Sequence, residues 1–165
     1  MKRVIFTAAA LVIAQPGFAQ PGTAQPGHPA GQTAAMVETA AVKAVLAQYH
    51  AAIERLDATG TEKLFTADSA VFETGGVEGS YVNYLARHLG PELGHFKSFK
   101  FSDYKADVRF EGPVALTTET YKYRIETKDG TIVERQGVST SALKKIDGQW
   151  KILLSHNSGR KPKGS

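Results

Sequence analysis

The chain contains no cysteine among its 165 residues. Disulfide bonds, thiolate nucleophiles and thiolate-bound metals are therefore excluded. Excess charge is also small, because 20 lysines and arginines face 16 acidic residues, for a formal net charge of +4. The sequence has no dense basic stretch with interleaved aromatic residues, so it predicts no nucleic-acid partner. A chain of this length still buries enough apolar surface to be stable without crosslinks.

The N-terminus has the pattern of a secretory signal. Two basic residues (2–3) precede an apolar run over residues 4–13. That run is shorter than the roughly 20 residues that cross a bilayer, so no membrane span is expected. Small residues predict cleavage after Ala19, with Ala14 and Ala24 as alternatives. The signal peptide is thus placed at residues 1–19, and the protein is expected to be periplasmic or extracellular.

The segment that follows has little capacity for regular structure. Gln-Pro-Gly triplets begin at residues 15, 20 and 25. Proline blocks backbone hydrogen bonding and glycine adds chain entropy, so residues 20–34 are predicted to be a disordered leader. A short basic tail is expected at residues 161–165. These limits leave one folded domain over residues 35–160.

Three helices are predicted at the start of this domain. Apolar side chains recur in steps of three and four over residues 35–57, which indicates an amphipathic helix. His50 lies at the edge of that apolar stripe and is interpreted as structural. Thr61 is a candidate cap for a second, short helix, and Ser80 for a third. Pro91 is expected to end or kink the third helix, because the residue before a proline avoids helical geometry. Alternatively, Pro91 begins a new short turn with Glu92 near its N-terminus.

The second half of the domain reads as β-structure. Turn signals such as Asp-Gly separate long β-prone runs, which is typical of hairpins. Helices followed by an antiparallel meander predict an α+β domain, with a curved sheet packed against three N-terminal helices. The expected strands are a short one at residues 69–74 and long ones at 96–111, 114–127, 131–145 and 149–158.

This order of elements resembles the nuclear transport factor 2-like superfamily. The turn, the tryptophan and the apolar pair of residues 145–158 are similar to its last hairpin and strand, and residues 65–72 resemble the start of its first strand. The resemblance covers residues 36–160. It implies a cone-shaped fold, a small-molecule pocket between sheet and helices, and a homodimer. The superfamily includes ketosteroid isomerase-like and SnoaL-like enzymes as well as noncatalytic binding domains, so the fold alone does not fix the chemistry.

Strand alternation suggests which side chains enter the cone, because residues two apart share a face. On the last strand these are expected to be Trp150, Ile152, Leu154, His156 and Ser158. On the strand at 114–127 they are expected to be Ala115, Thr117, Glu119, Tyr121 and Tyr123.

The resemblance to isomerase and dehydratase members implies acid–base catalysis in this pocket. His88 or His156 would act as general acid or base, and Glu73 or Glu119 would orient it. A tyrosine would donate to a developing oxyanion; the candidates are Tyr81, Tyr84 and Tyr121. No residue of the chain can be matched to the catalytic aspartate or His–Asp pair of those members.

A metal site is an alternative hypothesis. His88, Glu92 and His95 would stack on one face if the third helix continued straight. His156 from a facing strand would complete a set of nitrogen and oxygen donors that suits zinc, copper or iron. A third hypothesis is a domain that binds a small apolar ligand without chemistry. The sequence favours a secreted small-ligand-binding domain with a pocket lined by His, Glu and Tyr, and Trp150 is also expected to contact the ligand.

Overall fold

The computed structural model describes residues 29–162. The predicted signal peptide, the first part of the leader and the end of the basic tail lie outside these residues. The elements are α1 (Pro29–Glu54), η1 (Thr61–Leu64), β1 (Phe65–Glu73), β2 (Gly76–Gly79), α2 (Tyr81–Tyr84), η2 (Leu85–Leu89), α3 (Gly90–His95), β3 (Phe96–Glu111), β4 (Val114–Thr127), β5 (Ile132–Ile146) and β6 (Gln149–Arg160). Among the described residues, no helix is both long and apolar enough to cross a membrane.

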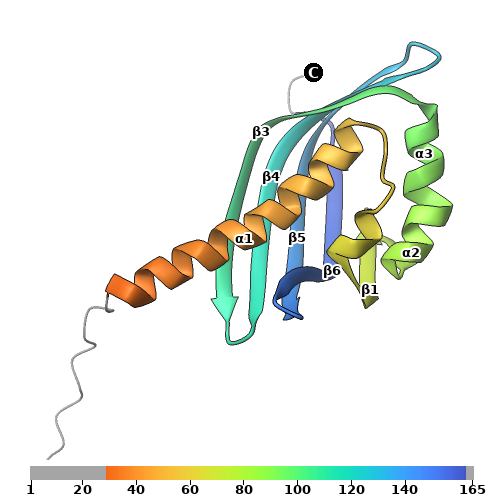
Figure 1. Ribbon diagram of the computed structural model, residues 1–165. Helices are drawn as coiled ribbons and strands as arrows, with labels where there is room; N and C mark the ends of the chain where they lie inside the picture. Colours follow the sequence, from red (N-terminus) through yellow and green to blue (C-terminus); the bar gives the residue numbers. More distant parts are fainter. Residues whose placement is uncertain (1–28, 163–165) are drawn as a thin grey trace, which may run out of the picture.

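One six-stranded sheet organises the domain, with strand order β2-β1-β6-β5-β4-β3. Strands β3 to β6 form an antiparallel meander, and β1 pairs parallel with β6. The sheet curves around α1, which crosses its concave face, while the segment containing α2 and α3 covers one end (Figure 1). The predicted α+β architecture is confirmed. Strand β2 was not among the expected strands.

Helix α1 begins at Pro29, ahead of the predicted start at residue 35. Proline is tolerated in the first helical turn because its missing N–H would have no partner there. Residues 29–34 are thus helical where the sequence predicts the end of a leader. The apolar stripe of α1 packs into the core through Val42, Val45, Leu46 and Ile53. Burying each such side chain contributes roughly 1.5–3 kcal/mol, which fixes α1 on the sheet.

The predicted third helix corresponds to α2, η2 and α3, which follow one another without a break. This helical segment runs through Pro91 rather than ending there. Ser80 caps it as predicted, since its Oγ accepts a hydrogen bond from the Asn83 N–H at 3.3 Å. Residues Leu85–Leu89 form a π turn, in which the Gly90 N–H bonds to the Leu85 carbonyl. A proline ring crowds the carbonyl four residues before it, and the wider turn provides room for the ring. The helix therefore does not end at Pro91, which instead lies in the first turn of α3 together with Glu92.

A bulge in β6 reverses which side chains face the helices. Leu143 pairs with Ile152 and Ala142 with Leu154, so Leu153 has no partner on β5. One extra residue turns every following side chain to the opposite face. Ile152 stays buried, whereas Leu154 and His156 are exposed. The predicted shared face from Trp150 to Ser158 was therefore wrong for Leu154 and His156, whereas Ser158 does line the cavity.

Candidate functional site

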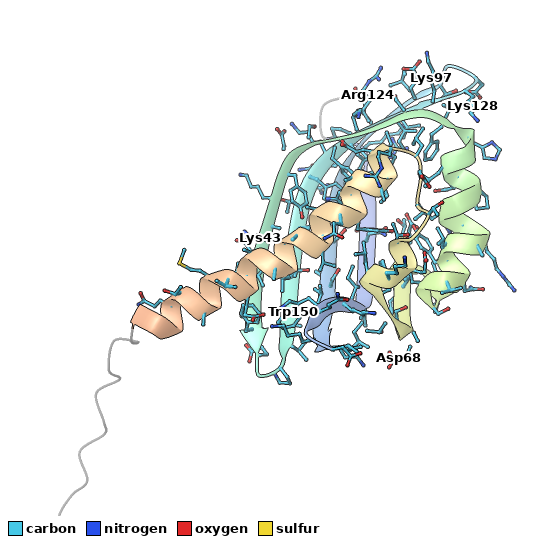
Figure 2. All side chains as sticks on the ribbon, in the orientation of Figure 1. Lys43, Asp68, Lys97, Arg124, Lys128 and Trp150 are labelled. Carbon is cyan, nitrogen blue, oxygen red and sulfur yellow. The ribbon has the colours of Figure 1, made fainter. Side chains whose placement is uncertain are left out.

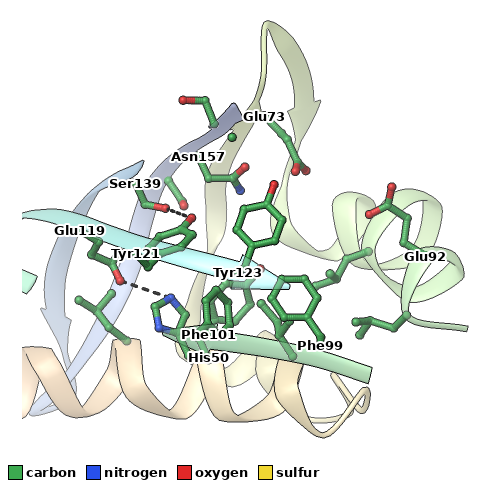
Figure 3. Close-up of a pocket in the computed structure, with 18 of the residues that line it drawn as sticks. His50, Glu73, Glu92, Phe99, Phe101, Glu119, Tyr121, Tyr123, Ser139 and Asn157 are labelled. Carbon is green, nitrogen blue, oxygen red and sulfur yellow. Dashed lines mark hydrogen bonds and ion pairs between the residues drawn. The ribbon is translucent and has the colours of Figure 1, made fainter. Parts of the chain in front are cut away.

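A cavity of about 350 Å³ lies between α1, the concave face of the sheet and the α3 end of the third helix. This volume is within the range of roughly 300–1,000 Å³ that is usual for small-ligand sites. Much of its wall is aromatic, and three carboxylates and one histidine also reach it (Figure 3). The aromatic lining residues are Tyr49, Tyr84, Phe96, Phe99, Phe101, Tyr121 and Tyr123.

A buried histidine–carboxylate pair lies in the depth of this cavity. His50 on α1 places Nε2 3.4 Å from Oε2 of Glu119 on β4, and Glu119 is 3% exposed (Figure 3). The Tyr104 hydroxyl donates to the same Oε2 at 2.8 Å. The other oxygen, Oε1, accepts no hydrogen bond from the described residues and is not sealed from the cavity. Glu119 thus has one oxygen held in place and one open to a ligand.

Burial sets the protonation of this pair. It lowers the pKa of His50 to about 4, although the charge of Glu54 acts in the opposite direction. Burial also raises the pKa of Glu119, and the hydrogen bond from Tyr104 partly offsets this. His50 is therefore neutral at pH 7, with one ring N–H available to donate. The pKa of Glu119 moves toward neutrality, which makes its carboxylate a stronger base than an exposed one.

Aromatic rings hold the imidazole of His50 in place. Phe101 stacks on it with centroids 4.4 Å apart, and Tyr104 meets it edge-on at 4.7 Å. Tyr121 approaches at 5.8 Å, and its hydroxyl is 2.8 Å from Ser139 Oγ. The pair is therefore fixed in orientation and shielded from bulk water.

Two glycines make room for the tyrosines of the cavity wall. Gly137 on β5 faces Tyr121 in register, and a Cβ at this position would overlap the Tyr121 ring. A Cβ on Gly159 in β6 would likewise overlap the Tyr123 hydroxyl. Glycine inside a strand often marks such a close approach. Here it lets both rings lie across the neighbouring strands.

A second, acidic cluster surrounds His88 beside the cavity. Its Nδ1 lies 3.2 Å from Glu78 Oε2, and its Nε2 lies 3.7 Å from Glu73 Oε2 and 3.4 Å from Glu92 Oε1. Glu73 also accepts a hydrogen bond from the Tyr84 hydroxyl at 2.7 Å. Partial burial alone would lower the pKa of His88, but the Glu78 hydrogen bond and the three charges raise it. Burial raises the pKa of Glu92.

The residues predicted to bind a ligand are only partly brought together. Glu73, Tyr84, Glu92, Glu119 and Tyr121 line the cavity, and His88 contacts two of them. Their roles in binding or catalysis stay predictions.

Two predicted ligand contacts lie elsewhere. Tyr81 is buried against Phe65 with ring centroids 3.6 Å apart, and its hydroxyl pairs with Thr61 at 2.6 Å. Trp150 lies at the end of the sheet opposite the β4–β5 turn that carries Lys128 (Figure 2), where its indole N–H donates to Glu38 at 2.6 Å. Neither lines the cavity. Trp150 instead ties α1 to the sheet.

The proposed metal ligands do not converge. His88 and Glu92 share a face, but His95 is exposed at the end of α3. His156 is exposed beyond the β6 bulge, with its ring 6.4 Å from that of Phe72. Across residues 29–162, no group of three or more His, Asp or Glu side chains is placed to hold a metal ion. The structure therefore does not assemble the four-residue set.

Four cavity-region residues were missed from the sequence: His50, Tyr104, Ser139 and Asn157. His50 was assigned to the core because it borders the apolar stripe of its helix. Tyr104 follows Asp103, which has φ +52°, at a register shift between Ser102 and Lys105. Alternation cannot follow a strand through such a shift. Asn157 enters the cavity because of the β6 bulge.

Comparison with known proteins assigns this sequence to a family. A sequence model of the SnoaL-like domain matches residues 42–160. The chain belongs to the SnoaL-like domain family. No curated protein matches the sequence of this SnoaL-like protein.

Solved structures share the nuclear transport factor 2-like fold of this SnoaL-like domain. A superfamily member from Salmonella enterica serovar Typhimurium LT2 is 19% identical, with a TM-score of 0.66, over 74% of this chain and 91% of its own. A Shewanella frigidimarina protein proposed to be a ketosteroid isomerase is 26% identical, with a TM-score of 0.61, over 69% and 91%. A Novosphingobium aromaticivorans protein proposed to be a scytalone dehydratase is 16% identical, with a TM-score of 0.70, over 81% and 98%.

Proposed function

We propose that this SnoaL-like domain binds a small, largely apolar ligand in its cavity and transfers a proton to or from it. One observation carries the proposal: Glu119 is buried, its Oε2 is held by His50 and Tyr104, and its Oε1 is open to the cavity. A carboxylate in apolar surroundings with a raised pKa is suited to general base catalysis near neutral pH.

The proposed step uses the two oxygens of Glu119 differently. Oε1 takes a proton from an acidic C–H or O–H of the ligand. The bond electrons stay on the ligand as an enolate or alkoxide. The hydrogen bond from Tyr104 and the contact with His50 at Oε2 hold the carboxyl group in position during the transfer. Returning the proton to a different ligand atom gives isomerisation, and returning it to a departing hydroxyl gives dehydration.

Asn157 is the candidate partner for negative charge that develops on the ligand. It lines the cavity, and within the described chain its side-chain amide makes no hydrogen bond. An amide N–H placed near a developing oxyanion stabilises it more than it stabilises the neutral ligand. Tyr121 is less free, because its hydroxyl is already paired with Ser139.

Two of the similar structures have been proposed as a ketosteroid isomerase and a scytalone dehydratase. Isomerisation and dehydration both need a group that takes up and returns a proton. The His50–Glu119 pair supplies such a group at the bottom of the cavity.

Deuterium exchange tests the proposal. The protein is incubated in deuterium oxide with small cyclic ketones such as cyclohexanone and tetralone, and uptake at the carbon beside the carbonyl is followed by NMR. We expect enzyme-dependent exchange that Glu119→Gln reduces by roughly 10²–10⁴-fold, the usual contribution of a general base. His156→Gln serves as the matched control, because His156 is exposed and outside the cavity. Equal rates for Glu119→Gln and wild type would refute the assignment.

Binding without turnover is the second candidate, favoured by the mainly apolar and aromatic lining of the cavity. It predicts ligand binding without deuterium exchange.

Export and self-association are further parts of the proposal. The N-terminal pattern supports export, which N-terminal sequencing of the mature protein tests. The exposed Val138 and Leu154 support a homodimer, which sedimentation tests.

A further inference from the structure

The charged groups that line the cavity have one sign. Glu73, Glu92 and Glu119 reach it, whereas no lysine or arginine of the described residues does. Arg135 on β5 pairs with Tyr123 in register, and its charge opposes the burial that raises the pKa of Tyr123. Its guanidinium donates to the Glu134 carbonyl at 2.9 Å instead of lining the cavity. A ligand therefore meets carboxylates and neutral groups in the cavity.

Glu73 and Glu92 reach the cavity from different elements. Glu73 ends β1 and Glu92 lies in α3, and Figure 3 shows both on the same side of the Tyr123 ring, away from His50. His88 contacts one oxygen of each, and Tyr84 donates to that oxygen of Glu73. The remaining oxygens, Glu73 Oε1 and Glu92 Oε2, accept no hydrogen bond from residues 29–162. Each carboxylate is thus held in place with acceptor capacity to spare.

Aromatic rings accompany these carboxylates. Tyr84 and Tyr123 line the cavity, and Phe99 stacks on Tyr123 with centroids 5.4 Å apart and an angle of 15°. Carboxylates beside aromatic faces suit an organic cation, because the face of an aromatic ring attracts positive charge. The charge of Glu73 also acts deeper in the cavity, on Tyr121. Burial raises the pKa of Tyr121 to about 12, and the charges of Glu119 and Glu73 both add to this rise.

We infer that the cavity selects organic cations, namely small ligands with a protonated amine beside an apolar or aromatic body. The amine lies between Glu73 and Glu92, and the body extends over the Tyr123 and Phe99 rings toward His50 and Glu119. This inference rests on the proposed function, because it names the class of ligand that the same cavity takes. Three carboxylates surround the single imidazole of His88, so acidic groups outnumber basic groups in this cluster.

Three probes of matched size test the inference: phenethylamine, phenethyl alcohol and phenylacetate, which are a cation, a neutral molecule and an anion at pH 7. Calorimetric titration at low salt is expected to show the amine binding at least about tenfold more tightly than the alcohol, and phenylacetate binding more weakly than both. Glu73→Gln/Glu92→Gln is expected to bring amine and alcohol within about threefold of each other. Glu111→Gln, at an exposed carboxylate outside the cavity, is the control that keeps the preference.

The inference is overturned if the alcohol or phenylacetate binds as tightly as the amine, if no probe binds, or if the double variant keeps the full preference. Should the double variant fail to fold, Glu92→Gln alone must reduce the preference, since Glu92 is half exposed and accommodates the change. Glu119→Gln separates this inference from the proposed function. It removes proton transfer but is expected to keep the tighter binding of the amine. In the wild-type protein, exchange without a preference for the amine refutes the inference about the amine, and a preference for the amine without exchange refutes the catalytic proposal.

Discussion

The molecule contains two histidine–carboxylate groups that treat the imidazole in opposite ways. His50 has one carboxylate at 3.4 Å and is surrounded by aromatic rings, and burial lowers its pKa to about 4. His88 has three carboxylates within 3.7 Å and is 32% exposed, and its pKa is raised. Water is the difference between them. Where water is excluded, the cost of charging the ring outweighs the attraction of a neighbouring carboxylate. Where water remains, several carboxylates raise the pKa of the ring and so favour its charged form.

The largest expected effect concerns the pH dependence of folding that His50 causes. The folded-state pKa of about 4 lies below the ordinary 6.5, so the unfolded chain binds more protons between these values. Stability is therefore present above about pH 6.5 and is lost as the pH falls toward 4, by up to about 3 kcal/mol. His50→Gln is expected to flatten this slope in urea unfolding followed by Trp150 fluorescence. A slope equal to that of wild type would mean that His50 titrates normally.

The next largest effect is expected from a substitution that disturbs the aromatic rings around His50 and Glu119. Gly137→Ala places a Cβ against the Tyr121 ring, and overpacking of this kind costs about 1–3 kcal/mol of unfolding free energy. Gly94→Ala is the matched control, because nothing lies within 4 Å of its added Cβ. That control is expected to be neutral or slightly stabilising. Urea unfolding measures both variants, and equal stabilities would show that the Tyr121 ring moves aside freely.

The smallest effect belongs to His88. Its raised pKa means that its contribution to stability is present below about pH 6.5 and is lost as the pH rises through the folded-state pKa. Because the site is partly exposed, we expect His88→Gln to cost less than about 1 kcal/mol at pH 6 and nothing at high pH. Its pH slope is thus opposite in sign to that of His50. Unfolding curves at both pH values decide this, and a difference that grows with pH would contradict it.

Sequence patterns identified the fold because caps, turns and strand alternation are local signals. They placed β3, β4 and the Ser80 cap well, and they predicted Glu119 to face the cavity. They did not find the partner of Glu119, because contact between α1 and β4 depends on packing of distant segments. His50 bears no local mark that distinguishes a core histidine from one that reaches a buried carboxylate.

Local irregularities account for the other differences. The π turn before Pro91 kept His88 and Glu92 on one face, although the proline predicted a break. The shift near Asp103 and the unpaired Leu153 changed which side chains enter the cavity. The π turn and the two register shifts each change the local spacing of residues. A sequence pattern with a fixed period cannot predict such a change in spacing.

The bulge at Leu153 has a consequence for how this kind of cavity diversifies. A last strand that kept regular pairing would turn Leu154 and His156 inward and send Ser155 and Asn157 to the outer surface. The amide at the cavity wall would then be replaced by an imidazole, with no change to any amino acid. A shift of the β6 pairing by one residue is thus enough to exchange the chemical character of the cavity while the helices and the other strands stay as they are.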